Sequence, residues 1–146
     1  MTGPPRHCSL DDRKRLMIPS EWRALVKTKD FVYVRAEMTD KGPCLVLMPP
    51  AELDARLEKL KQVPLSAGMH TNMSTLAKCS EHVKMDKLGR IRICDKLLKL
   101  AEIEEKAVAI PAFTCLELWS QATAPAEESL DELKGELKKA LAEMGI

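Results

Sequence analysis

Two short segments of the sequence carry the same pair of side chains at the same spacing. Asp11 and Arg15 are four residues apart, and so are Asp86 and Arg90. On a tight hairpin the two residues lie near opposite ends of the turn, so the carboxylate can accept hydrogen bonds from the guanidinium and hold it in one direction. An exposed ion pair that only closes a hairpin contributes about 0 to 1 kcal/mol. The pattern indicates either such a pair or an arginine oriented for binding.

Extra cations in the first segment favour binding. Arg13, Lys14 and Arg15 are consecutive, and three adjacent cations repel one another unless an anion lies close by. The phosphate backbone of DNA is the expected anion, and an arginine fork also suits the guanine edge in the major groove. Lys87 is the only cation within the second turn.

The five cysteines and three histidines give a weaker signal for a metal or thiol site. Cys79 and His82 form a Cys-x-x-His pair, with Cys94 and Cys115 as further candidates, but structural zinc needs a second closely spaced pair of ligands. Cysteine is also a frequent small core residue. We therefore expect no metal site, no cofactor and no enzymatic activity, and keep a thiol or metal enzyme using Cys79, His82 or Cys94 as an alternative.

The two Asp-x-x-x-Arg segments belong to an internal repeat. Three pairs of segments align in the same order along the chain: Leu10–Ile18 with Met85–Ile93 at an offset of 75, Phe31–Val34 with Ala107–Ile110, and Cys44–Leu47 with Cys115–Leu118. Each repeat predicts a hairpin, a short helix, two further strands and a closing helix. The predicted organisation is α+β, with a first repeat at 1–62, a connection at 63–80 and a second repeat at 81–146.

Turn formers and caps predict the element boundaries. Gly89 takes a positive φ at no steric cost, whereas Lys14 at the equivalent position should cost about 1 kcal/mol in a left-handed conformation or force a different turn. The other expected elements are a helix at 21–26 capped by Ser20, a helix at 96–101 capped by Asp95, a turn at 40–43, a helix at 51–61 and a helix from Glu127. The last helix has an apolar face that should pack on its own protein or on a neighbouring subunit.

Composition limits the function classes. A chain of 146 residues makes one domain or two very small ones, and with 3% aromatic residues it has little material for stacking single-stranded bases. No apolar run suits a membrane span or a signal peptide, so we expect a cytoplasmic protein. The net charge of +1 conceals two opposed ends, +3 over residues 1–30 and −3 over residues 121–146, which cancel. A small basic tip binds DNA weakly alone, so this pattern predicts an oligomer.

At these residues the sequence resembles the MraZ transcriptional regulators, whose fold belongs with the AbrB-type swapped-hairpin proteins. The resemblance rests on Leu10–Pro19 and Met85–Ile93, with support from Cys44–Pro49 and Leu116–Trp119, and covers roughly residues 8 to 120. It implies two tandem AbrB/MraZ-like ββαββα repeats that form a pseudo-twofold, β-barrel-like core with flanking helices. It also implies a nucleoid-associated, sequence-specific regulator of the division and cell-wall gene cluster, assembled into rings of about eight subunits that contact repeated boxes in double-stranded DNA.

The expected DNA-binding residues follow from the two turns. Arg15, oriented by Asp11, should read bases, while Arg13, Lys14 and Arg6 should hold phosphates. Arg90 with Asp86 either makes equivalent contacts or is structural, and Lys87 accompanies them. Lys14 stands where the family usually has Gly, and Cys94 stands near its usual Pro. The alternative is a scaffold or protein-interaction module of the same fold that has lost specific DNA binding.

Overall fold

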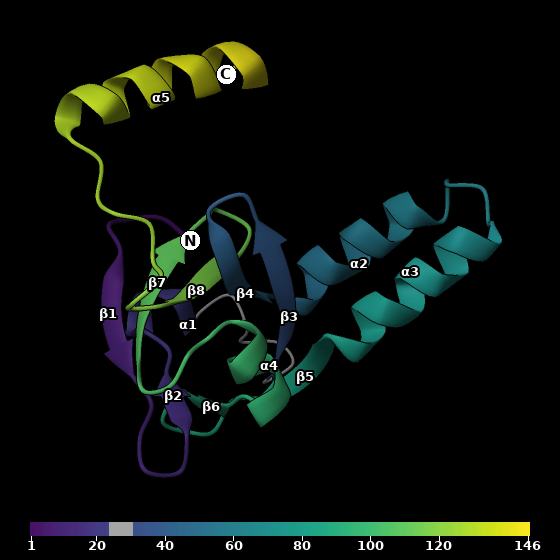
Figure 1. Cartoon of the computed structure of the whole chain (residues 1–146), viewed down its shortest axis with the longest axis horizontal. Helices are drawn as coiled ribbons and strands as arrows, with labels where there is room; N and C mark the ends of the chain where they lie inside the picture. The colour runs from purple at the N-terminus through teal and green to yellow at the C-terminus, as the bar shows by residue number, and fades with distance from the viewer. Residues whose placement is uncertain (24–30) are drawn as a thin grey trace.

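The computed structural model describes residues 1–23 and 31–146, which contain eight strands and five helices (Figure 1). The elements are β1 (Arg6–Ser9), β2 (Arg15–Met17), α1 (Ser20–Arg23), β3 (Phe31–Thr39), β4 (Gly42–Met48), α2 (Pro50–Leu60), α3 (Ala67–Lys78), β5 (Ser80–Lys84), β6 (Arg90–Arg92), α4 (Asp95–Leu100), β7 (Lys106–Pro111), β8 (Leu116–Ser120) and α5 (Leu130–Met144). The predicted α+β class is confirmed. In the described residues, no helix has both the length and the apolar character needed to cross a bilayer.

Strands from the two halves of the chain are interleaved. Six strands form an antiparallel sheet in the order β1-β7-β8-β4-β3-β5, and β2 pairs with β6 in a separate two-stranded ribbon. The first strand of each half therefore pairs with the third strand of the other half. If β1–β4 are exchanged for β5–β8, the strand order reads the same in reverse. Neither half can complete this pairing alone.

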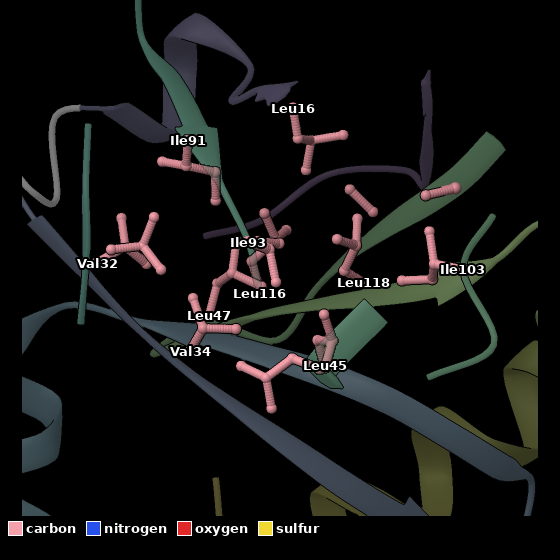
Figure 2. Packing of buried hydrophobic residues seen from close by; sticks show 14 of the residues in the cluster. Leu16, Val32, Val34, Leu45, Leu47, Ile91, Ile93, Ile103, Leu116 and Leu118 are labelled. Atoms are coloured by element: carbon pink, nitrogen blue, oxygen red, sulfur yellow. The ribbon is translucent and has the colours of Figure 1, made fainter. Parts of the chain in front are cut away.

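The core follows from the alternation of apolar residues along these strands. Val32 and Val34 are buried on β3 while Tyr33 and Arg35 between them are partly exposed, as the two-residue period of a strand requires. Both halves contribute to the main core (Figure 2), whose buried residues include Leu16, Val34, Leu45, Leu47, Ile91, Ile93, Leu116 and Leu118. A second cluster, Cys44, Val46, Met48, Cys115 and Trp119, covers the opposite side of β4 and β8. The two central strands are thus buried on both faces.

Several predicted boundaries agree with the structure. The expected turn at 40–43 joins β3 to β4, and the expected helix at 51–61 corresponds to α2. Ser20 is the first residue of α1 and not the cap before it, so the prediction that Ser20 caps this helix is wrong, and the predicted continuation of the helix over 24–26 lies outside the described residues. The weak periodicity of 63–80 does not predict α3, although Ser66 caps this helix by accepting a hydrogen bond from the N–H of Met69 at 3.1 Å.

The prediction that Asp95 caps the helix near residue 96 is wrong. The N-cap of α4 is Cys94, whose backbone N–H donates to Glu81 Oε1 at 2.7 Å. Asp95 is the first residue of the helix, and its carboxylate accepts hydrogen bonds from the side chains of Lys14 and Arg92. Tertiary contacts from β5 and from the first turn thus replace the local capping bond that the sequence suggested.

The C-terminal helix begins slightly later than its predicted start near Glu127. Ser129 and Glu132 form a capping box at the start of α5, which fixes its first turn. No residue of α5 is buried in the described chain, and its apolar face lies in solvent: Leu130, Leu133, Leu137, Leu141 and Met144 are all exposed. The face therefore does not pack on its own protein.

Candidate nucleic-acid interface

The first candidate turn is closed by one carboxylate that uses both oxygens. Asp11 Oδ1 accepts hydrogen bonds from the backbone N–H groups of Arg13 at 2.9 Å and Arg15 at 2.8 Å. Asp11 Oδ2 accepts a hydrogen bond from Arg15 Nε at 2.8 Å. The N–H of Lys14 also donates to the Asp11 carbonyl at 2.9 Å. The guanidinium of Arg15 is thus held by the same residue that shapes its turn.

The second turn repeats this arrangement almost atom for atom. Asp86 Oδ1 accepts from the N–H groups of Leu88 and Arg90, both at 2.9 Å, and Oδ2 accepts from Arg90 Nε at 2.7 Å. The backbone N–H of Arg15 lowers the pKa of the Asp11 carboxyl, and that of Arg90 lowers the pKa of Asp86, in each case helped by the guanidinium. Both carboxylates therefore remain charged at neutral pH, as the oriented pairs require.

Lys14 adopts the left-handed conformation that its position in the turn demands. Its φ is 58°, against 84° for the equivalent Gly89. Of the two outcomes expected from the sequence, the strained residue in an unchanged turn is the one observed. A residue with a β-carbon costs about 1 kcal/mol or more in this region. The first turn therefore keeps the geometry of the second at the expense of backbone strain.

The pairing of β2 with β6 gathers arginines from both halves on one surface. Leu16 lies opposite Ile91, and each is 1% exposed because both point into the core. The neighbouring positions point the other way, so that Arg15 lies opposite Arg92 and Met17 opposite Arg90. We call this outer surface of the ribbon the basic face: Arg15, Arg90 and Arg92, with Lys14 and Arg23 beside them. In Figure 1 the ribbon lies at the bottom, away from α5 and from the α2–α3 hairpin.

Arg23 and Arg92 are members of the basic face that were not among the predicted binding residues. Arg23, at the end of α1, donates from Nε to the Ile18 carbonyl at 2.7 Å and lies against Met17 Sδ at 3.0 Å. Arg92 occupies the exposed end of β6. The alternation Arg90-Ile91-Arg92 was the available signal for Arg92, because residues two apart on a strand share a face.

The other predicted cations differ in their surroundings. Lys14 Nζ pairs with Asp95 Oδ1 at 3.2 Å, beside the pair between Arg92 and the same oxygen at 3.4 Å. Arg6 lies on β1 rather than at the turn, and pairs with Glu21. Within residues 1–23 and 31–146, the side chains of Arg13 and Lys87 have no ion-pair partner. These two remain available to an external anion.

The thiols and histidines do not converge. In the part of the chain that the structure describes, no three His, Cys, Asp or Glu side chains are placed to hold a metal ion together. Cys79 follows the last residue of α3 and Cys94 precedes α4. His82 on β5 contacts the rings of Phe31 and Tyr33 on β3, in a tilted and an edge-on arrangement respectively. Burial raises the pKa of Cys8 to about 11 and, with nearby Glu117, that of Cys44 to about 12. Those two thiols stay protonated at neutral pH and are poor nucleophiles.

Known proteins similar in sequence to this chain match it over most of its length. A family model described as "MraZ protein, putative antitoxin-like" matches residues 78–124, which include β5 to β8. Transcriptional regulator MraZ of Thiobacillus denitrificans is 30% identical over 117 residues, or 78% of this chain and 77% of that protein. The protein of the same name from Clostridium acetobutylicum is 29% identical over 119 residues, 77% of each chain. That from Polaromonas sp. is 27% identical over 129 residues, 88% of each chain.

The strain at Lys14 predicts an unusual order of stability. Lys14→Gly should unfold with a free energy about 1 kcal/mol higher than Lys14→Ala, because both variants lose the Asp95 pair and only glycine relieves the left-handed backbone. Urea denaturation of the two variants measures the difference. At the exposed helical position Lys99, glycine should instead be less stable than alanine by about 0.5 to 1 kcal/mol. The same order at both positions would contradict a left-handed Lys14.

The lowered pKa values of Asp11 and Asp86 predict an acid-sensitive contribution to stability. A carboxyl whose folded pKa lies below its unfolded value of about 3.9 stabilises the fold above that pH and loses this effect as the pH falls through the folded pKa. The native chain should therefore be more stable than the Asp11→Asn, Asp86→Asn double variant at pH 6. The gap should narrow progressively as the pH falls below about 4, when the carboxyls of the folded chain become protonated, as urea denaturation would measure. A gap that does not change with pH would show that the carboxylate charge is unimportant.

Proposed function

Because this chain belongs to the MraZ family of transcriptional regulators, we propose that it is a regulator that binds double-stranded DNA sequence-specifically through the basic face. The observation that carries the proposal is the duplicated turn, in which Asp11 orients Arg15 and Asp86 orients Arg90 with nearly identical geometry. An exposed pair that served stability alone would contribute little. Two guanidinium groups held in fixed directions on one surface are instead suited to hydrogen bonds with acceptor atoms at fixed positions, such as those on base edges.

A two-stranded ribbon such as β2–β6 is suited to entry into the major groove. That groove is about 12 Å wide in B-form DNA and admits a two-stranded β-ribbon. Arg15 and Arg90 are each held through Nε, and among the described residues the terminal N–H groups of the two guanidiniums have no hydrogen-bond partner, so they can donate to the O6 and N7 atoms of guanine. Arg13 and Lys87 at the turns would contact phosphates, and Lys14 would do so after release from Asp95. Arg6, on β1, would contact phosphate farther from the bases.

We also propose a tandem swapped-hairpin organisation, with one repeat at 1–62, a connection at 63–80 and a second repeat at 81–146. Support comes from the pairing of β1 with β7 and of β5 with β3, in which each half lends its first strand to the other. The duplicated turns lie one in each proposed repeat. In this arrangement the chain has the internal symmetry of a dimer, and each repeat supplies one Asp-Arg pair to the basic face.

Several copies of the basic face would be needed for tight binding. One face makes few phosphate contacts, and linked faces gain affinity through high effective concentration. We propose a nucleoid-associated ring of about eight subunits that contacts repeated boxes in the promoter of the division and cell-wall gene cluster. The exposed apolar face of α5 supports association between subunits, because an amphipathic helix ordinarily buries its apolar face against a protein surface.

Arg15→Ala tests the proposed function. The variant should bind a duplex from the chain's own promoter about fivefold to 150-fold more weakly, because a bidentate contact with guanine contributes about 1 to 3 kcal/mol. Fluorescence anisotropy with a labelled duplex measures the loss. Binding to a random duplex of equal length should fall much less, since base readout adds little there.

Lys99→Ala is the matched control, since it removes one exposed cation on α4 that is not a member of the basic face. Arg15→Ala binding that matches this control on both duplexes would overturn the proposal. A native chain that fails to retain either duplex at low salt, yet holds a stable protein partner, would support the scaffold alternative.

The ring predicts a mass many times that of the chain. Sedimentation velocity should show a species near eight times the 16.3 kDa chain, with no large fraction at 16.3 kDa. Replacing Leu133 and Leu137 on α5 by Ser should shift the distribution toward smaller species if the helix joins subunits, whereas Ser at the exposed loop residue Leu65 should not. A native chain that sediments only as a monomer would exclude the ring.

A further inference from the structure

We call the end of the ribbon where Arg15 lies opposite Arg92 its second side. Three charged residues at this end align with uncharged residues in the other copy of the internal repeat. At the offset of 75, Lys14 aligns with Gly89, Arg92 with Met17, and Asp95 with Ser20. These three charges meet in the folded chain, because Asp95 Oδ1 accepts from Lys14 Nζ at 3.2 Å and from Arg92 at 3.4 Å. The charges are therefore coupled in space although they come from three different elements.

Arg92 occupies a place that matches that of Arg23 on the other side of the ribbon. Arg23 donates to the carbonyl of Ile18, and Arg92 donates to the carbonyl of Ile93. Ile18 and Ile93 are equivalent residues of the two repeats, whereas the residue aligned with Arg23 is Leu98, which is buried in the core. The guanidinium on the second side thus comes from Arg92 on β6, whereas the one on the other side comes from Arg23 on helix α1.

We propose that Arg92 contacts a DNA phosphate, as Arg23 does at the equivalent place on the other side of the ribbon, and that the phosphate at Arg92 displaces Asp95 from it. The inference rests on the proposed DNA binding and adds a residue and an internal competitor to it. Four arginines then surround the centre of the ribbon: Arg15 and Arg90 in the oriented turns, and Arg23 and Arg92 outside them.

The difference between the two aspartates on this side explains why only one is displaced. Asp11 is tied into its turn by two backbone N–H groups as well as by Arg15. Asp95 holds Arg92 through one 3.4 Å contact, and its side chain is 53% exposed. Exchange of this exposed carboxylate for a phosphate therefore breaks little structure, whereas removal of Asp11 would open the turn.

Like-charge repulsion on the ribbon adds a driving force for anion binding. Arg15 and Arg92 are directly opposite on β2 and β6, where side chains start about 4.5 to 5.5 Å apart and like charges destabilise the pair. Asp11 remains paired with Arg15, and a phosphate that replaces Asp95 keeps the charge of Arg92 neutralised. Nη1 of Arg92 donates to the Ile93 carbonyl and keeps this partner after Asp95 is displaced, so Arg92 is better suited to a contact with phosphate than to a bidentate contact with a base edge.

The test compares Arg92→Ala, Arg92→Lys, Arg23→Ala and Asp95→Asn with the Lys99→Ala control, using the promoter and random duplexes over a series of NaCl concentrations. Arg92→Ala and Arg23→Ala should each weaken binding to both duplexes by about fivefold to tenfold and reduce the salt slope by about one. Arg92→Lys should stay within about threefold of the native chain, since a phosphate accepts a point charge. Asp95→Asn should bind both duplexes about threefold to tenfold more tightly, with a steeper salt slope.

The opposite signs expected for Arg92→Ala and Asp95→Asn separate contact from support. If Arg92 only braced α4 through Asp95, both variants would weaken binding together, and that result would overturn the inference. Arg92→Ala binding equal to Lys99→Ala would also overturn it. If Arg15→Ala loses promoter binding while Arg92→Ala does not, the proposed function stands and only this inference fails. Urea denaturation of each variant checks that it is folded, and Arg92→Lys retains the test if the alanine variant is not.

Discussion

The basic face depends on the carboxylates of Asp11 and Asp86. Each uses one oxygen to satisfy two backbone N–H groups of a tight turn and the other to hold an arginine by Nε. Hydrogen bonds to a charged group are stronger than neutral ones, so turn shape and arginine direction are set together. This is also why the first turn keeps its geometry when a lysine occupies the left-handed position.

Interleaving of the two halves turns these local units into a surface. The β2–β6 ribbon exists only when both halves are folded, because each half supplies one strand. Burial of Leu16 and Ile91 against the shared core fixes which side of the ribbon faces outward, and the arginines follow from the pleat. The surface is symmetric in its oriented turns and asymmetric around them, with Arg23 and Met17 on one side and Lys14, Arg92 and Asp95 on the other.

Much of the fold could be predicted where the governing contacts are short in sequence. The α+β class and α2 follow from strand periods and prolines, and alignment of the repeat made a left-handed Lys14 one of the two expected outcomes. The role of Asp95 could not, because its local pattern is that of a cap while its partners come from another turn and another strand. Helix α3 was missed since its Ser, Thr and Asn content weakens the apolar period that marks a helix.

By itself, the sequence determined the two Asp-x-x-x-Arg turns, since every bond that closes them joins residues at most four positions apart. Tertiary structure alone decided which other charges stand beside them. Lys14 and Asp95 are 81 residues apart, and Arg92 faces Arg15 only through the register of β2 on β6. Register is set by how the buried side of a ribbon fits a core built from both halves, and that fit is not encoded in any one segment.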